Sequence, residues 1–146
     1  MEIRFIKKHE DAKLPKKNNK HHSTGDVGYD IFAVESIQIA PGDSVVVPVG
    51  LQLAFMTAGY WFRIEARSGL GFKKSLQPHF GVIDNPYRGD LGVKVYNLSD
   101  KVQSIEKGTA CAQLIIYKMI SAEIGWTDQI VPTARGDRGF GSSDLI

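Results

Sequence analysis

Alternating apolar and polar positions recur along this chain and predict β-strands. In "SVVVPVGLQLAF" every second residue from Val45 to Phe55 is apolar, which predicts a strand with one buried face. The same period continues in "YWFRIEARS", where Tyr60, Phe62 and Ile64 share a face. Further strands are predicted at residues 3–6, 30–34, 37–39, 91–96 and 112–120. No long stretch has the helical period, so we expect an all-β barrel or sandwich with at most one short helix, near residues 71–76.

Composition limits the class of protein. The 146 residues suit one domain, and shares of 42% apolar and 23% charged residues are those of a globular chain. A net charge of +2 is too small to indicate a nucleic-acid partner. The start "MEIRFIKKHE" lacks the apolar core of a secretion signal, and no apolar run has the roughly 18 residues of a membrane span. We therefore expect a soluble protein, cytoplasmic or otherwise intracellular, with no membrane partner.

Two segments are not expected to join the core. Residues 7–22 carry six lysines and are predicted to form a solvated loop, in which adjacent His21 and His22 lack the spacing of a metal site. The C-terminal "ARGDRGFGSSDLI" is too polar to order itself, so we predict a domain over residues 1–134 and a mobile tail over residues 135–146. The one cysteine, Cys111, lies in an apolar run and is expected to fill the core.

Two stretches carry chemistry suited to phosphate. "ARSGLG", residues 66–71, places a guanidinium, a hydroxyl and backbone donors at a strand end, although taken alone an ordinary surface turn explains it slightly better. The tail combines arginines, hydroxyls and glycine N–H groups with the ring of Phe140, a platform for a base. A flexible linker explains the glycines equally well and the arginine and the phenylalanine less well, so the tail alone leaves both hypotheses open.

Three single polar residues also need an explanation. Asp84 in "GVIDNPYRG" follows an apolar run and is a candidate general base if it is buried, although Asp before Asn-Pro is also good turn chemistry. Asp30 in "GDVGYDIFA" lies among apolar neighbours and needs a partner, which is a hydrated cation or a turn. Gln113 in "KGTACAQLII" is the one polar side chain of its run and needs a buried partner.

Taken in order, these stretches resemble the five motifs of the trimeric dUTPases, the deoxyuridine triphosphate nucleotidohydrolases. The matching strings are "VGYDIFA", "RSGLG", "GVIDNPYRG", "KGTACAQLI" and "RGDRGFGSS", and the resemblance runs from about Gly25 to Ser143. It implies a jelly-roll-like distorted β-barrel and a homotrimer whose sites each draw motifs from all three subunits. The implied reaction is hydrolysis of dUTP to dUMP and pyrophosphate with Mg²⁺, which limits uracil in DNA and supplies dUMP for dTMP synthesis.

The resemblance also implies residue roles. Asp84 matches the base that deprotonates the attacking water, and Tyr87 matches the ring that lies against the deoxyribose and excludes a ribose. The tight hairpin around them reads uracil through its backbone, with Gly81 and Gly92 as the matching positions. Asp30 matches an aspartate that holds Mg²⁺ through water. The other implied substrate-binding residues are Arg67, Ser68 and Gly69 at the phosphates, Gln113 at the α-phosphate, and Arg135, Phe140, Gly141 and Ser142 in a tail that closes over a neighbouring subunit's site.

The chain departs from the family pattern at a few places. Ala66 replaces a common proline, "GTACAQ" replaces "GDRIAQ", Asn85 and Pro86 replace a polar or acidic pair, and Arg138 replaces a frequent glycine. The related dCTP deaminases carry a catalytic glutamate where this chain has Lys94, which argues against deamination. Two further hypotheses are a non-catalytic regulator on the same scaffold and a nucleic-acid-binding barrel, and the small net charge disfavours the barrel.

Overall fold

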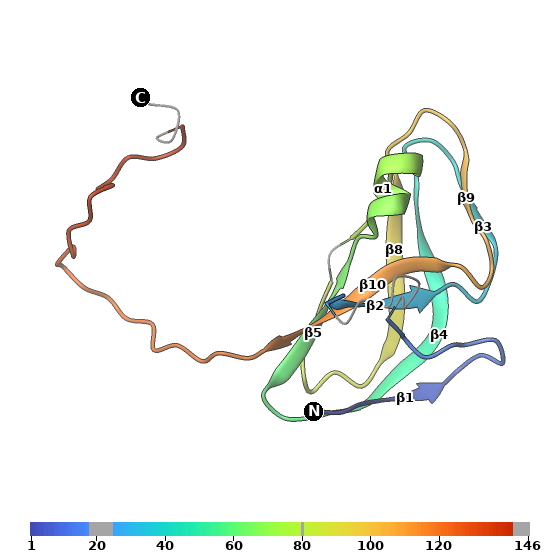
Figure 1. The fold of residues 1–146 in the computed structure, drawn as a ribbon, viewed down its shortest axis with the longest axis horizontal. Coiled ribbons are helices and arrows are strands. Elements are labelled where there is room, and N and C mark those ends of the chain that lie inside the picture. Colours follow the sequence, from blue (N-terminus) through green and yellow to red (C-terminus); the bar gives the residue numbers. More distant parts are fainter. Residues whose placement is uncertain (18–24, 80, 142–146) are drawn as a thin grey trace.

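The computed structural model describes residues 1–17, 25–79 and 81–141, and its regular elements are almost all strands (Figure 1). They are β1 (Ile3–Lys7), β2 (Gly28–Phe32), β3 (Ile37–Ile39), β4 (Ser44–Met56), β5 (Tyr60–Glu65), α1 (Ser68–Lys74), β6 (Leu76–Pro78), β7 (Gly81–Ile83), β8 (Asp90–Asn97), β9 (Gln103–Ile105) and β10 (Ala110–Lys118). The predicted all-β class is confirmed. In the described part of the chain α1 is the one helix, and it is much too short to cross a membrane.

The strands form three antiparallel sheets rather than one closed barrel. One four-stranded sheet has the order β1-β4-β8-β6, a second has the order β2-β10-β5-β7, and β3 pairs with β9. Buried side chains from all three sheets form one core cluster. Its largest fully buried members are Phe62, Ile31, Ile39, Leu53, Leu76, Ile105 and Leu114. Cys111 is buried in the same cluster, as predicted.

The alternation predicted for residues 45–55 holds for most of β4 and then reverses. The odd positions are buried from Val47 to Leu53, but Phe55 is 46% exposed and Met56 is buried in its place. The pairing explains the change, because Arg4 lies opposite Phe55 while Phe5 lies opposite Leu53, which leaves one extra residue in β4. Such a bulge moves every later side chain to the opposite face, so the predicted burial of Phe55 is wrong.

Other boundaries differ from the predicted ones by a few residues. β2 starts at Gly28 rather than residue 30, because its pairing with β10 begins where Gly28 lies opposite Ile115. β10 ends at Lys118 rather than residue 120. The short strands β6, β7 and β9 have only three residues each, too few to show a period in the sequence. The helix begins at Ser68, earlier than residue 71, and ends at Lys74, followed by Ser75 in a left-handed conformation.

After β10 the chain leaves the body of the protein as an extended arm (Figure 1). Every described residue of the arm beyond Tyr117 is exposed, including the large apolar side chains Ile120, Ile124, Trp126, Ile130 and Phe140. Met119 forms the last backbone hydrogen bond to the body, from its N–H to the carbonyl oxygen of Gly59 at 2.8 Å. These apolar side chains remain in water and so contribute no hydrophobic stabilisation to the single chain, and the arm has no core of its own.

Candidate active site

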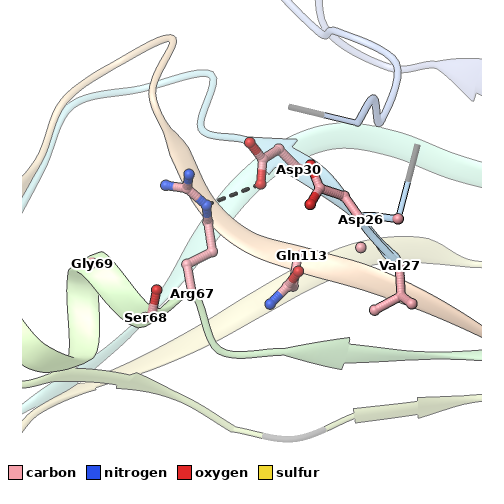
Figure 2. A pocket seen from close by; sticks show the side chains of 9 residues that line it. Asp26, Val27, Asp30, Arg67, Ser68, Gly69 and Gln113 are labelled. Carbon is pink, nitrogen blue, oxygen red and sulfur yellow. Dashed lines mark hydrogen bonds and ion pairs between the residues drawn. The ribbon is translucent and has the colours of Figure 1, made fainter. Parts of the chain in front are cut away.

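A polar cleft of about 480 Å³ lies at the ends of β2 and β5, where α1 begins (Figure 2). Five residues that the sequence analysis singled out line it together: Asp30, Arg67, Ser68, Gly69 and Gln113. They come from three of the five matched strings, which are far apart in sequence. The fold therefore gathers a guanidinium, a hydroxyl, an amide and a carboxylate into one site.

The central position of β10 brings these residues together. Gln113 lies opposite Asp30 of β2 on one side and opposite Glu65 of β5 on the other. Directly opposed residues in antiparallel strands project on the same face of a sheet, so Asp30 and Gln113 share the cleft face. The chain then passes from Glu65 through Ala66 and Arg67 into α1, which places Arg67 beside the same row.

Arg67 is held by an ion pair with Asp30. Its Nε donates to Asp30 Oδ1 at 2.9 Å, and its Nη1 donates to the carbonyl oxygen of Ala110 at 3.5 Å. Both side chains are largely shielded from water, at 30% and 16% exposed. Asp30 therefore has the partner that the sequence required, and within the described residues neither contact uses the second terminal nitrogen of Arg67. That nitrogen is left to meet an anionic ligand in the cleft.

Gln113 also has its predicted partner. Its Nε2 donates to the carbonyl oxygen of Ala66 at 2.7 Å, which fixes the orientation of the amide. The other face of the amide lies against Gly28, where any Cβ would overlap Gln113 Oε1. Gly28 is thus required by the close approach of a side chain. The sequence analysis missed this role and the other cleft residues that precede β2, namely Gly25, Asp26 and Val27.

The carboxylates of the cleft suit a hydrated divalent cation that is bound mainly by the phosphate oxygens of a ligand. Asp26 and Asp30 both line the cleft, and Figure 2 shows both carboxylates at the β2 side of it. Carboxylate oxygens are the ligands that Mg²⁺ prefers, and Mg²⁺ usually keeps several waters while it binds phosphate oxygens. In the described part of the chain no three acidic, His or Cys side chains converge to form a complete metal cage. The residues therefore fit an ion held through water.

Asp84 lies elsewhere, in a second hollow of about 390 Å³ lined by Trp61, Val82, Asp84, Asn85, Pro86 and Met119. None of the cleft residues lines this hollow. Asp84 is exposed in the single chain, and the neighbouring Val82 is 57% exposed, so one chain alone does not provide the burial that the sequence analysis required of a general base here. One chain thus presents the phosphate-type groups and the candidate base in two separate places.

Tyr87 is fixed on the loop that follows Asp84. Its hydroxyl donates to the carbonyl oxygen of Asp90 at 2.7 Å, and its N–H donates to the carbonyl oxygen of Asp84 at 3.0 Å. The ring lies so close to Gly89 that a Cβ there would be 2.5 Å from Tyr87 Cζ. The ring remains 41% exposed. The Tyr87 ring is therefore both fixed in position and partly exposed.

The predicted tight hairpin around this loop is wrong. β7 pairs with β5, whereas β8 pairs with β4 and β6, so the loop over residues 84–89 crosses between the two large sheets. Gly81 lies opposite Ile64 and Gly92 lies opposite Pro48, in different sheets. The sequence pattern did not reveal this, because apolar strands flanking a Pro-Tyr-Arg-Gly turn look the same whether or not they pair with one another.

The described tail residues, 135–141, do not line the cleft of their own chain. Arg135 donates from Nε to the carbonyl oxygen of Arg138 at 2.9 Å, and Arg138 donates from Nε back to that of Arg135 at 2.8 Å. These reciprocal bonds close a local turn at the end of the arm. Phe140 and Gly141 follow it and are fully exposed, and Ser142 lies outside the described residues.

Few titratable groups are strongly perturbed. Burial raises the pKa of the Cys111 thiol from its ordinary value of 9.0 to about 12, so this residue stays protonated and unreactive at neutral pH. On the surface, a hydrogen bond from Lys107 lowers the pKa of Asp11, and the same contact raises that of Lys107. Neither effect lies in the cleft or in the Asp84 hollow.

Comparison with known proteins gives one consistent result. A family model described as dUTPase matches residues 15–144. The deoxyuridine 5'-triphosphate nucleotidohydrolase of Picosynechococcus sp. is 35% identical over 147 residues, covering 98% of this chain and 99% of its own. The Helicobacter pylori (strain ATCC 700392 / 26695) protein of the same name is 34% identical, covering 99% of this chain and 98% of its own.

Solved structures of dUTPases are also similar to this chain. A mutant of the Staphylococcus bacteriophage 80alpha dUTPase with dUpNHpp superposes with a TM-score of 0.84 at 25% identity, covering 97% of this chain and 98% of its own. A mutant dUTPase from the S. aureus phage phi11, described with a structural Mg(II) ion, gives a TM-score of 0.77 at 23% identity, covering 89% of this chain and 99% of its own. At that lower identity the likeness concerns the fold.

Proposed function

This chain belongs to the dUTPase family, and we propose that it hydrolyses dUTP to dUMP and pyrophosphate through groups drawn from more than one copy of the chain. The observation that carries the second part is that the cleft and the Asp84 hollow share no lining residue. Neither place alone has both phosphate-binding groups and a base facing it. A homotrimer in which the cleft of one copy meets the Asp84 loop of another completes the site.

In this arrangement the cleft binds the triphosphate. Arg67 and Ser68 supply charged and neutral hydrogen-bond donors for the phosphate oxygens, and the backbone at Gly69 approaches closely because it carries no side chain. Gln113, fixed by Ala66, orients the α-phosphate. A Mg²⁺ ion held through water by Asp30 would neutralise part of the phosphate charge.

Asp84 is the proposed general base. It accepts a proton from a water molecule whose oxygen forms a bond to the α-phosphorus, while the bond from that phosphorus to the bridging α,β-oxygen breaks and pyrophosphate leaves. The reaction needs no covalent intermediate, so positioning of the water and stabilisation of charge supply most of the rate. The exposure of Asp84 in one chain is consistent with a role that begins only after a second copy covers it.

The loop over residues 84–89 selects the nucleobase and the sugar of the substrate. Tyr87 presents its fixed ring to the deoxyribose, where a ribose 2′-hydroxyl would collide with it. β7 and β8 belong to different sheets and do not pair with one another, and the backbone groups near Gly81 and Gly92 that their pairing with β5 and β4 leaves unused would read uracil. The arm then carries Arg135, Phe140, Gly141 and Ser142 to a neighbouring copy, where they cover the bound nucleotide.

The direct test measures pyrophosphate release from dUTP, dCTP, dTTP and UTP, each with Mg²⁺ and with a chelator. We expect release from dUTP alone, at a rate that falls steeply when the metal is removed. Light scattering after gel filtration should give the mass of a trimer. Release from dCTP or UTP at comparable rates would refute the proposed selectivity, and an active monomer would refute the shared site.

A further inference from the structure

The residue after Asp84 anchors the loop to a distant turn. Asn85 Nδ2 donates to the carbonyl oxygens of Thr57 at 2.8 Å and Tyr60 at 2.9 Å, with a longer contact to that of Met56 at 3.4 Å. An amide nitrogen has two hydrogens, so the two short bonds use both. All three acceptors are carbonyls, which fixes the orientation of the amide without ambiguity.

The turn that Asn85 contacts joins the same two sheets as the Asp84 loop does. It connects β4 of the first sheet to β5 of the second, and residues 84–89 connect β7 of the second to β8 of the first. Asn85 therefore ties two crossings together side by side. The same turn also receives the N–H of Met119, where the arm begins, so the arm and the loop start from one support.

The Asp84 side chain depends on how its backbone is held. In the described part of the chain its carboxylate makes no hydrogen bond or ion pair, so its position follows from its backbone alone. On one side Ile83 is held opposite Phe62 in the sheet. On the other side the next fixed point is the Asn85 amide.

From this arrangement we propose that Asn85 is a positioning residue for Asp84, acting through the turn over residues 57–60. The inference rests on the proposed role of Asp84 as base. The far end of the loop is held separately, since Arg88 Nη1 donates to the carbonyl oxygens of Asn85 and Tyr87, and Gln52 Nε2 donates to that of Arg88. These bonds keep the shape of the loop, whereas the Asn85 amide sets where the loop begins. Displacing a catalytic group by about 1 Å costs on the order of 100-fold in rate.

The experiment compares Asn85→Ala with Asn97→Ala. Asn97 is a matched control because its Nδ2 also donates to two carbonyl oxygens, those of Ile39 and Lys101, both at 2.8 Å, and it lines neither the cleft nor the Asp84 hollow. Both variants should lower Tm, since each leaves two carbonyls without a donor. We expect kcat per folded chain to fall at least tenfold for Asn85→Ala, with KM for dUTP within threefold of the wild type. For Asn97→Ala we expect kcat per folded chain to be unchanged.

Equal kcat values per folded chain in the two variants would overturn the proposal, because Asn85 would then act only on stability. If Asn85→Ala does not fold, Asn85→Ser, which keeps one donor, serves the same comparison, and an unchanged kcat there overturns the proposal as well. Asp84→Asn is measured in parallel. Substantial turnover in Asp84→Asn would refute the base assignment itself, whereas loss of turnover there with a fully active Asn85→Ala would refute only the positioning role.

Discussion

The Gln113 amide fills the space directly above the Cα of Gly28, so closely that a Cβ at residue 28 would lie 2.8 Å from Gln113 Cδ. The two residues are on neighbouring strands, and each limits the other: Gln113 can hold its bond to Ala66 only because residue 28 has no side chain. A backbone position next to the cleft is thus as constrained as the polar groups themselves.

Gly28→Ala should therefore impair the cleft without changing its charge. The added methyl group forces Gln113 to give up its bond to Ala66 and to turn toward the ligand space. We expect at least a tenfold loss of kcat/KM for dUTP, which corresponds to about 1.4 kcal/mol or more. Steady-state kinetics checks this. Gly125→Ala, in the arm with open space around its Cα, is the control and should behave as the wild type.

Gly89→Ala should relax the discrimination between dUTP and UTP. A Cβ at residue 89 meets the Tyr87 ring, so the ring must tilt and its bond to Asp90 must lengthen or break. If Tyr87 excludes the ribose by contact, the ratio of kcat/KM for dUTP to that for UTP should fall by a factor of ten or more. An unchanged ratio with a lower rate for both nucleotides would remove Tyr87 from the sugar test.

Removing residues 135–146 should cost activity and leave the fold. The deleted residues that the structure describes are all exposed, and their arginines bond only to backbone oxygens within the tail and to that of Ala134 directly before it. We expect Tm within about 2 °C of the full-length protein and kcat/KM lower by two orders of magnitude or more, since water would no longer be excluded from the bound nucleotide. A large fall in Tm would show that the tail is structural.

Cys111 should make stability decline at alkaline pH. Its pKa is raised by burial from 9.0 to about 12 in the folded chain, so the unfolded chain loses this proton first as the pH rises. The protonated thiol makes its full contribution to the free energy of unfolding below pH 9. This contribution declines between pH 9 and 12, by at most about 4 kcal/mol. Urea unfolding of the wild type and of Cys111→Ala at pH 8 and pH 10.5 measures it. The stability difference between the two proteins should be smaller at pH 10.5.

The sequence predicted the strands best where the period was long and uninterrupted. Apolar alternation over several residues is a strong signal, and it predicted β4, β5 and β8. Polar side chains next to or within such apolar stretches drew attention to Arg67, Ser68 and Gln113. Phe55 was misplaced because one extra residue in β4 has no mark in the pattern. Such a bulge depends on the register with β1, which is a property of two strands together.

The errors at the site have a similar origin. The pairing of β7 with β5 rather than β8, and the exposure of Asp84, depend on which sheet each strand joins, and a local string does not contain that information. The anchoring role of Asn85 was also missed. Its residue type suits a turn equally well, and its acceptors lie about 25 residues away in sequence. The roles of the individual site residues stay predictions until the kinetics are measured.

The separation of the Arg67 cleft from the Asp84 hollow has a genetic consequence. If the site is shared between chains, an Arg67 variant and an Asp84 variant are each inactive when expressed alone. When both are expressed in one cell, some mixed assemblies contain a site in which the Asp84 variant supplies an intact Arg67 and the Arg67 variant supplies an intact Asp84. Two inactive alleles should therefore complement one another. A substitution in the arm would likewise impair the site of a neighbouring chain rather than a site in the chain that carries it. The activity of a mixture would therefore depend on the relative amounts of the two alleles.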